Sequence, residues 1–179
     1  MKKFHIGIDE SKEMSRETYV YVAVFSCLER DAVERLTTRK KTLSTSELEE
    51  IFRNEERDFI YATSRKGSPK SLPDIVPGLI KSFRETRNLQ NDAIAVEIFI
   101  DGNIGTYTIP LEMSIKALEN VSLLRLQGFP KGKNRYNEPK EPCYLYSPIL
   151  EMAHSLAYQI ARTNVNFETS EFHSSVKSG

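Results

Sequence analysis

The sequence has only two cysteines, Cys27 and Cys143, and neither stands in a Cys-x-x-Cys or Cys/His pattern. This excludes a zinc site of the usual structural kind, and a disulfide is not expected in a reducing compartment. No apolar run approaches the roughly 20 residues that are needed to span a bilayer. The N-terminal residues lead directly into a strand pattern and lack the apolar core and cleavage site of a signal peptide. We therefore expect a cytoplasmic protein without a membrane partner.

An excess of charge of either sign is also missing, since 25 acidic residues balance 25 basic ones. The chain as a whole is thus not drawn to nucleic acid, and any such binding needs a local basic patch. Internal repeats and long linkers are absent, and 179 residues with 39% hydrophobic content suit one globular domain. We expect this domain to span residues 1–165, and residues 166–179, whose pattern is weak, to form a flexible tail.

What the sequence does contain is an alternation of strand and helix patterns. Residues 3–9 and 18–26 are rich in β-branched and aromatic side chains, and the short polar segment between them favours a β-hairpin. Further strands are predicted at residues 59–63, 93–101 and 121–126, and helices at residues 74–87, 110–120 and 147–162, with two amphipathic helices between residues 29 and 58. An early hairpin followed by helix-linked strands predicts an α/β fold with a mixed sheet flanked by helices.

Two of these strands run into acidic residues. The first strand ends with Asp9 and is followed by Glu10, and the strand at residues 93–101 ends with Asp101. An acid at the end of a buried strand must be solvated, paired or bound to a cation. If the two strands are neighbours, the three carboxylates meet in one site, where they repel one another unless a cation or a shared proton relieves them.

Such a cluster of oxygen ligands selects Mg²⁺ or Mn²⁺ rather than zinc. Two ions about 3.5–4 Å apart can stabilise the attacking and the leaving oxygen of a phosphodiester displacement. The alternative is that Asp9 and Asp101 only end strands and begin turns, for which aspartate is well suited. The spacing alone favours neither interpretation.

The predicted helix at residues 147–162 adds two candidates. Glu151 and His154 lie on its polar stripe, opposite a stripe of leucine, isoleucine and alanine. Glu151 is a candidate fourth carboxylate. His154 is a candidate ligand or proton-transfer residue, and the alternative is a solvated or hydrogen-bonded surface histidine. A Glu-x-x-His di-iron centre would need a second such pair and a helical bundle, and the sequence indicates neither.

The segment after Gln127 is rich in proline, glycine, lysine and asparagine, which predicts a loop. It carries Lys131, Lys133, Arg135 and Tyr136, and basic residues around an aromatic suit a phosphate backbone and a stacked base or sugar. The alternative is an ordinary solvated loop.

At this point the motifs resemble a known family. Gly7-Ile8-Asp9-Glu10 resembles the opening Gly-Ile-Asp-Glu motif of type 2 ribonuclease H, and Asp101-Gly102-Asn103 resembles that family's later Asp-Gly-Asn motif. The helix at residues 147–162 looks, more loosely, like the family's small-residue helix. The resemblance implies a ribonuclease H-like fold, with a five-stranded mixed sheet of strand order 3-2-1-4-5. In that fold the first and fourth strands are neighbours, which would bring Asp9 and Asp101 together.

The chain also departs from the family's pattern. Type 2 enzymes continue with a Gly-Arg-Gly segment that contacts the RNA 2′-hydroxyl, and here Ser11-Lys12-Glu13 stands in that place. Their fourth acid lies in a Lys-Gly-Asp segment that this chain lacks, so Glu151 is the expected replacement. The resemblance implies a metal-dependent nuclease core and leaves ribonucleotide-specific cleavage open. We also predict that Lys12 and Asn103, beside the two motifs, contact nucleic acid.

We accordingly predict a divalent-metal-dependent nuclease that hydrolyses phosphodiester bonds in an RNA/DNA hybrid or in structured DNA or RNA. The predicted ligands of Mg²⁺ or Mn²⁺ are Asp9, Glu10, Asp101 and Glu151, and His154 is a further predicted catalytic residue. One alternative is an inactive module of the same fold that binds nucleic acid through the loop of residues 131–140. Another is a phosphotransferase of the actin-like group, whose second domain and glycine-rich phosphate loops are missing from the sequence.

Overall fold

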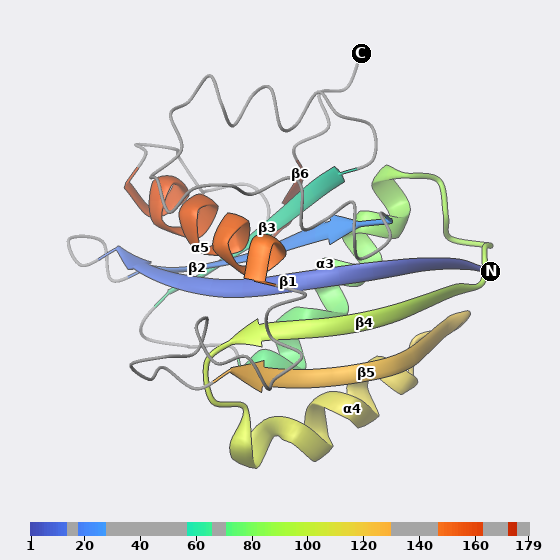
Figure 1. The fold of residues 1–179 in the computed structure, drawn as a ribbon. Coiled ribbons are helices and arrows are strands. Elements are labelled where there is room, and N and C mark those ends of the chain that lie inside the picture. The colour runs from blue at the N-terminus through green and yellow to red at the C-terminus, as the bar shows by residue number, and fades with distance from the viewer. Residues whose placement is uncertain (14–17, 28–56, 66–70, 130–146, 163–171, 175–179) are drawn as a thin grey trace.

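A computed structural model describes residues 1–13, 18–27, 57–65, 71–129, 147–162 and 172–174. Its six strands form one mixed sheet in the order β5-β4-β1-β2-β3-β6 (Figure 1). The strands are β1 (Lys2–Glu13), β2 (Thr18–Ser26), β3 (Arg57–Arg65), β4 (Ile94–Asp101), β5 (Val121–Phe129) and β6 (Phe172–Ser174). The first five have the predicted order 3-2-1-4-5, but the predicted number of five was wrong, because a sixth strand extends the sheet beyond β3.

This sixth strand comes from the segment that we predicted to be a flexible tail. Phe172–Ser174 pairs antiparallel with β3, and His173 lies opposite Tyr61. Three residues are too few to produce a recognisable alternation in the sequence, so the pattern could not predict this strand. Its backbone pairs with part of β3, a strand that would otherwise end the sheet.

The central strand β1 has one antiparallel and one parallel neighbour. It forms an antiparallel hairpin with β2, from His5 opposite Ser26 to Glu13 opposite Thr18. On its other side it runs parallel to β4, with Ile8 opposite Ile100. Because β4 is almost wholly apolar and buried, it fits between two parallel neighbours, β1 and β5.

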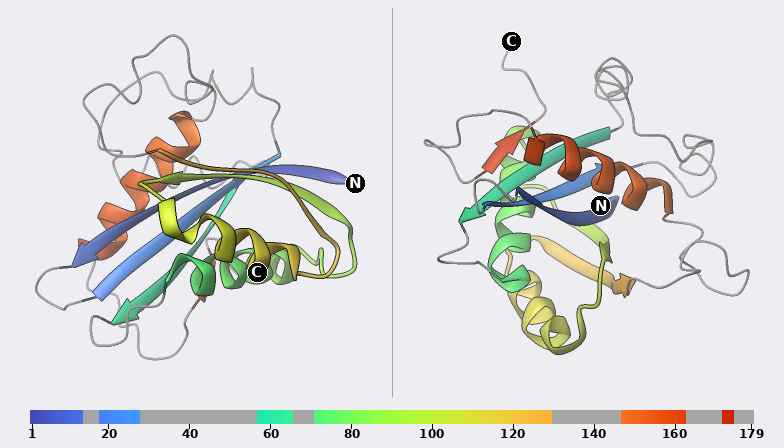
Figure 2. Two further views of the ribbon diagram at one scale, coloured as in Figure 1. Left: turned by 90° about the horizontal axis from the view of Figure 1, so that it is seen from below. Right: turned by 90° about the vertical axis from the view of Figure 1, so that its left-hand side faces the viewer.

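Helices cover both faces of the sheet (Figure 2). One face carries α3 (Leu72–Thr86) and α4 (Thr108–Lys116), which a short helix, η1 (Gly105–Tyr107), precedes. The other face carries α5 (Ser147–Arg162), which lies over β1 and β2. Among the described helices, none has the length and apolar character that a membrane span requires. Of the range in which two helices were predicted, residues 29–56 lie outside the described residues, and residues 57 and 58 belong to β3.

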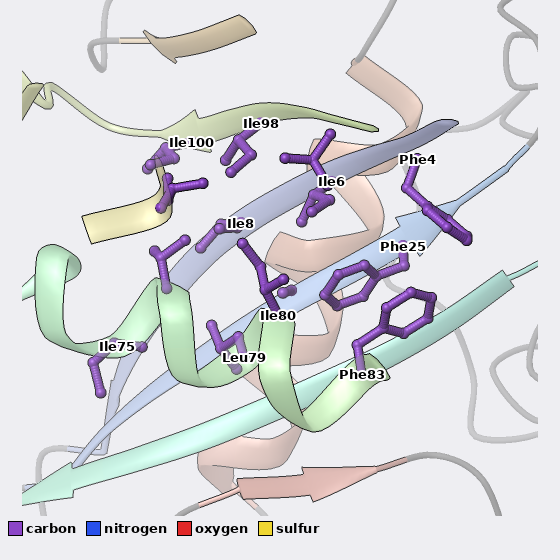
Figure 3. Close-up of a cluster of buried hydrophobic side chains, with 14 of the residues drawn as sticks. Phe4, Ile6, Ile8, Phe25, Ile75, Leu79, Ile80, Phe83, Ile98 and Ile100 are labelled. Carbon is purple, nitrogen blue, oxygen red and sulfur yellow. The ribbon is translucent and has the colours of Figure 1, made fainter. Parts of the chain in front are cut away.

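Strand alternation divides the core into two layers. Phe4, Ile6 and Ile8 of β1 face α3 and α4, where Phe25 and Phe83 stack with their ring centroids 3.9 Å apart (Figure 3). Val20, Val22 and Val24 of β2 face α5 and pack against Ile149, Met152, Ala153, Leu156, Ala157 and Ala161. Each large apolar side chain contributes about 1.5–3 kcal/mol by its removal from water, so both helical layers are firmly held.

The buried guanidinium of Arg84 in α3 binds the two chain segments that lead into β4 and β5. Its Nε donates to the carbonyl of Leu89 at 3.1 Å, and its Nη1 donates to the carbonyl of Glu119 at 2.7 Å. Its Nη2 donates to the carbonyls of Gln90 and Asp92. These bonds tie the segments before β4 and β5 to α3, and they satisfy the guanidinium in a buried position.

Candidate metal centre

Three side chains from three elements meet at one end of the sheet. They are Asp9 of β1, Asp101 at the last position of β4, and His154 of α5. One possible ligand atom from each lies within 4.8 Å of the others. Both aspartates are buried, whereas His154 is exposed. The described part of the chain thus contains an Asp/Asp/His group whose geometry could hold a metal ion.

The register of the parallel strands explains why the two aspartates meet. The ladder between β1 and β4 runs as far as Ile8 opposite Ile100, so Asp9 and Asp101 are the next residues on each strand. Side chains at opposed positions of a sheet point to the same face. Asp9 also lies opposite Val22 of β2, whose side chain packs under α5. The aspartates therefore belong to the face that α5 covers.

Gly7 allows α5 to come close enough for His154 to join them. It precedes Asp9 by two residues and so points to the same face of the sheet. A Cβ atom on Gly7 would lie 2.8 Å from the backbone oxygen of Ile149 and would also clash with the Ile149 side chain. Only glycine fits there, and the first turn of α5 rests directly on β1. His154, little more than one turn further along α5, then reaches Asp9.

Asp9 has one satisfied oxygen and one orphaned oxygen. Its Oδ2 lies 2.7 Å from Nδ1 of His154, and the side chains are 1% and 62% exposed. Its Oδ1 is buried and has no hydrogen-bond partner among the described residues. A buried carboxylate oxygen without a partner is costly, and it is rare unless an ion or water fills the place. The unsatisfied oxygen is therefore available to a bound cation.

The turn after Asp101 is held against the end of β5. Gly102 has a φ of 146°, a conformation that glycine adopts more readily than other residues, and its N–H donates to the Phe129 carbonyl at 2.8 Å. A Cβ on Gly128 would lie 2.8 Å from the Gly102 oxygen, so this contact also needs glycine. Asn103 is exposed, and its Oδ1 accepts from the Gly105 N–H at 2.9 Å. Asn103 thus shapes the turn beside Asp101.

Glu10 lies on the opposite face of the sheet from Asp9. Its partner across the hairpin is Tyr21, which belongs to the core under α3 and α4. Burial, and then the nearby charge of Glu10, raise the pKa of Tyr21 to about 12. Glu10 is exposed there. The structure therefore does not bring Glu10 into the group formed by Asp9, Asp101 and His154.

The other predicted site residues cannot be placed in the same way. The backbone of Glu151 lies in α5 and that of Lys12 in β1, but their side chains lie outside what the structure describes. The predicted nucleic-acid contacts in the loop after β5 also lie outside the described residues: Lys131, Lys133, Arg135 and Tyr136.

A row of polar residues that was not predicted from the sequence lies on the same face as Asp9, four residues earlier along β1. Glu97 of β4 lies opposite His5. Its Oε1 forms an ion pair with Nζ of Lys3 at 2.7 Å. Nδ1 of His5 is 3.3 Å from the other Glu97 oxygen. Burial lowers the pKa of His5, and Glu97 opposes that effect. The available signal was Glu97 itself, the one charged residue within an otherwise apolar strand before Asp101.

Comparison with known proteins gives distant structural likenesses and no match by sequence. No protein-family model matches the chain, and no curated protein matches it either. A chain in the solved structure of the PCNA:RNase HII complex from Archaeoglobus fulgidus is similar, with a TM-score of 0.45 and 14% identity. The match covers 90% of this chain and 73% of that one. What the molecule itself establishes is an α/β fold with a mixed sheet and an Asp/Asp/His group at one end of it.

Proposed function

We propose that the chain is a divalent-metal-dependent nuclease of the ribonuclease H-like class, which hydrolyses phosphodiester bonds in nucleic acid. The observation that carries the proposal is the convergence of Asp9, Asp101 and His154, together with the buried, unsatisfied Oδ1 of Asp9. Acids gathered only to end strands would not need a histidine from a distant helix or leave an oxygen without a partner.

The group fits a divalent cation. Two carboxylates and an imidazole are common protein ligands of such ions, and the buried carboxylates favour a bound positive charge. Asp9 would offer its orphaned oxygen, and Asp101 and His154 would complete the protein's share of the ligands. The predicted cofactor remains Mg²⁺ or Mn²⁺, and such an ion can activate a water molecule and stabilise charge on a phosphate.

The strand arrangement supports the choice of class. The order of the first five strands agrees with that expected from the resemblance to type 2 ribonuclease H. The parallel neighbours β1 and β4 carry the Gly-Ile-Asp and Asp-Gly-Asn motifs at the same end of the sheet. Fold does not determine activity, so a nuclease activity has to come from the Asp/Asp/His group.

The residues of the chain would have different tasks. Asp9 and Asp101 would bind the cation from the neighbouring strands β1 and β4. His154 is oriented by its contact with Asp9 and is open to solvent, so it could also exchange a proton with water or a leaving group. Glu10 lies on the other face of the sheet and is not proposed as a ligand of this ion. Glu151 remains a predicted participant. The same holds for the nucleic-acid contacts Lys12, Asn103, Lys131, Lys133, Arg135 and Tyr136, and for a cytoplasmic location.

The proposal is tested by offering the protein labelled RNA/DNA hybrid, single-stranded DNA and RNA, and branched DNA, with Mg²⁺, with Mn²⁺ and with a chelator. We expect metal-dependent cleavage of at least one substrate and a loss of at least about 100-fold in Asp101→Asn, since a metal ligand is removed. Glu112→Gln, which changes a half-exposed acid of α4 outside the site, is the matched control. Full activity of Asp101→Asn would refute the proposal, and metal-independent binding without cleavage would favour the inactive module.

A further inference from the structure

The separation of Glu10 from Asp9 changes what kind of metal site the chain can form. Consecutive residues of a strand point to opposite faces, and β1 continues as a paired strand through both residues as far as Glu13. The described ligands on the α5 face are therefore two carboxylates and one imidazole. Glu10 is on the face of Tyr21, across the sheet from them.

This ligand set matches the charge of one divalent ion. The carboxylates of Asp9 and Asp101 carry two negative charges, and a histidine that ligates a metal is neutral. Two ions about 3.5–4 Å apart would place four positive charges against these two. The three possible ligand atoms lie within 4.8 Å of one another, which is the spread expected around one ion. The described ligands therefore match the charge of one ion.

The histidine also affects which ion is preferred. Mg²⁺ is a hard ion that favours oxygen ligands and loses its water reluctantly. Imidazole nitrogen suits transition metals better, and their affinities for such sites rise from Mn²⁺ upward. Since a possible ligand atom of His154 lies within 4.8 Å of those of both aspartates, a cation held by the two carboxylates has an imidazole within reach. Nitrogen in the ligand set penalises Mg²⁺ relative to Mn²⁺.

We infer that the site binds one divalent transition-metal ion per chain, Mn²⁺ in preference to Mg²⁺, on Asp9, Asp101 and His154. The inference rests on the metal site of the proposed function, and it narrows the cofactor and the number of ions. It makes His154 the residue that sets metal selectivity. It also makes Glu10 dispensable for metal binding.

The test measures metal binding without nucleic acid. Mn²⁺ is titrated into the full chain by calorimetry and by the loss of the free-ion electron paramagnetic resonance signal, and Mg²⁺ is titrated alone and in competition. We expect one Mn²⁺ per chain and an affinity for Mg²⁺ that is lower by about tenfold or more. His154→Asp makes the set all oxygen, so its preference for Mn²⁺ should shrink to about threefold or less. Glu10→Gln should bind Mn²⁺ as the wild type does.

Each contrary outcome overturns the inference. These outcomes are two Mn²⁺ ions per chain, equal affinity for the two metals, no Mn²⁺ binding, or a Glu10→Gln variant that loses an ion. An unchanged metal preference in His154→Asp would do the same. His154 is exposed, so its variants should fold. Circular dichroism of His154→Asp and of a second variant, His154→Asn, checks that both are folded.

The outcome for the proposed function is separate. A nuclease that works on two Mg²⁺ ions would overturn the inference and leave the proposed function standing. One bound Mn²⁺ without cleavage of any nucleic acid would support the inference and overturn the proposed function.

Discussion

Gly7 of β1 and the first turn of α5 are in contact at Ile149, without room for a single additional carbon atom. This contact sets the height of α5 above the sheet. The height in turn decides whether His154 can reach Asp9, which lies on the same face of β1 two residues beyond Gly7.

The first prediction is that Gly7→Ala weakens the metal site without touching a ligand. The new methyl group must push α5 away, which should cost about 1–3 kcal/mol of stability and lower Mn²⁺ affinity by separating His154 from Asp9. Thermal melts and calorimetry measure the two effects. Adding Ile149→Ala should restore only part of each, because the backbone oxygen of Ile149 would still lie 2.8 Å from the new Cβ. Normal Mn²⁺ affinity in Gly7→Ala would contradict the prediction.

The second prediction concerns the linkage between metal and stability. An ion that binds only the folded chain stabilises it by about 2.7 kcal/mol at a concentration of 100 times its Kd. We expect Mn²⁺ to raise the melting temperature, a chelator to reverse the rise, and Asp9→Asn to abolish it. Glu112→Gln should respond as the wild type does. A similar rise in Asp9→Asn would place the bound ion elsewhere on the molecule.

The third prediction is a loss of stability at alkaline pH through Tyr21. Its pKa is about 12 in the folded protein against 10.0 ordinarily, so the folded state keeps a proton that the unfolded state has released. Stability from this residue is therefore complete below pH 10 and falls as the pH rises to 12, by about 2–3 kcal/mol in all.

Two measurements check the behaviour of Tyr21. The phenolate absorbance of the wild type should show one tyrosine with a pKa near 12, and Glu10→Gln should lower that value, because the charge of Glu10 is one of its causes. Denaturant melts of Tyr21→Phe should show a flatter decline of stability between pH 10 and 12. An identical decline in both proteins would assign the effect to another group.

The fourth prediction concerns Arg84. Arg84→Met removes the donor to four carbonyl groups and should cost about 2–4 kcal/mol, because those groups lose a charged partner in partly buried surroundings. Arg84→Lys keeps the charge but not the planar set of donors, so it should recover only part of the loss. Chemical denaturation measures both variants. A cost below about 1 kcal/mol for Arg84→Met would show that water replaces the guanidinium at little cost.

Much of the fold was predictable because its strands are apolar and its helices amphipathic. The runs that became β2 and β4 are dense in β-branched residues, and the predicted bounds of the last helix, residues 147–162, are those of α5. The meeting of Asp9 with Asp101 followed from two neighbouring strands that end in acids. Strand β6 could not be predicted, because three residues that pair with β3 are too few to show a strand pattern in the sequence.

The site was harder to predict because it depends on where strands end and how a helix is seated. We expected the first strand to stop at Asp9, which would have freed Glu10 to turn toward the same site. The strand instead continues to Glu13 because β2 pairs with it throughout, and strict alternation carries Glu10 to the other face. The helical stripe made His154 a candidate, but only the contact between Gly7 and Ile149 shows how that stripe is seated on the sheet.

The three proposed ligands are far apart along the chain. They are residues 9, 101 and 154, so the proposed metal centre joins the beginning, the middle and nearly the end of the described polypeptide. During synthesis, the hairpin of β1 and β2 can form early, but the centre has to wait until α5 has left the ribosome. If the proposed ion binds here, its binding should therefore require α5, and a nascent chain that ends before His154 should lack the site.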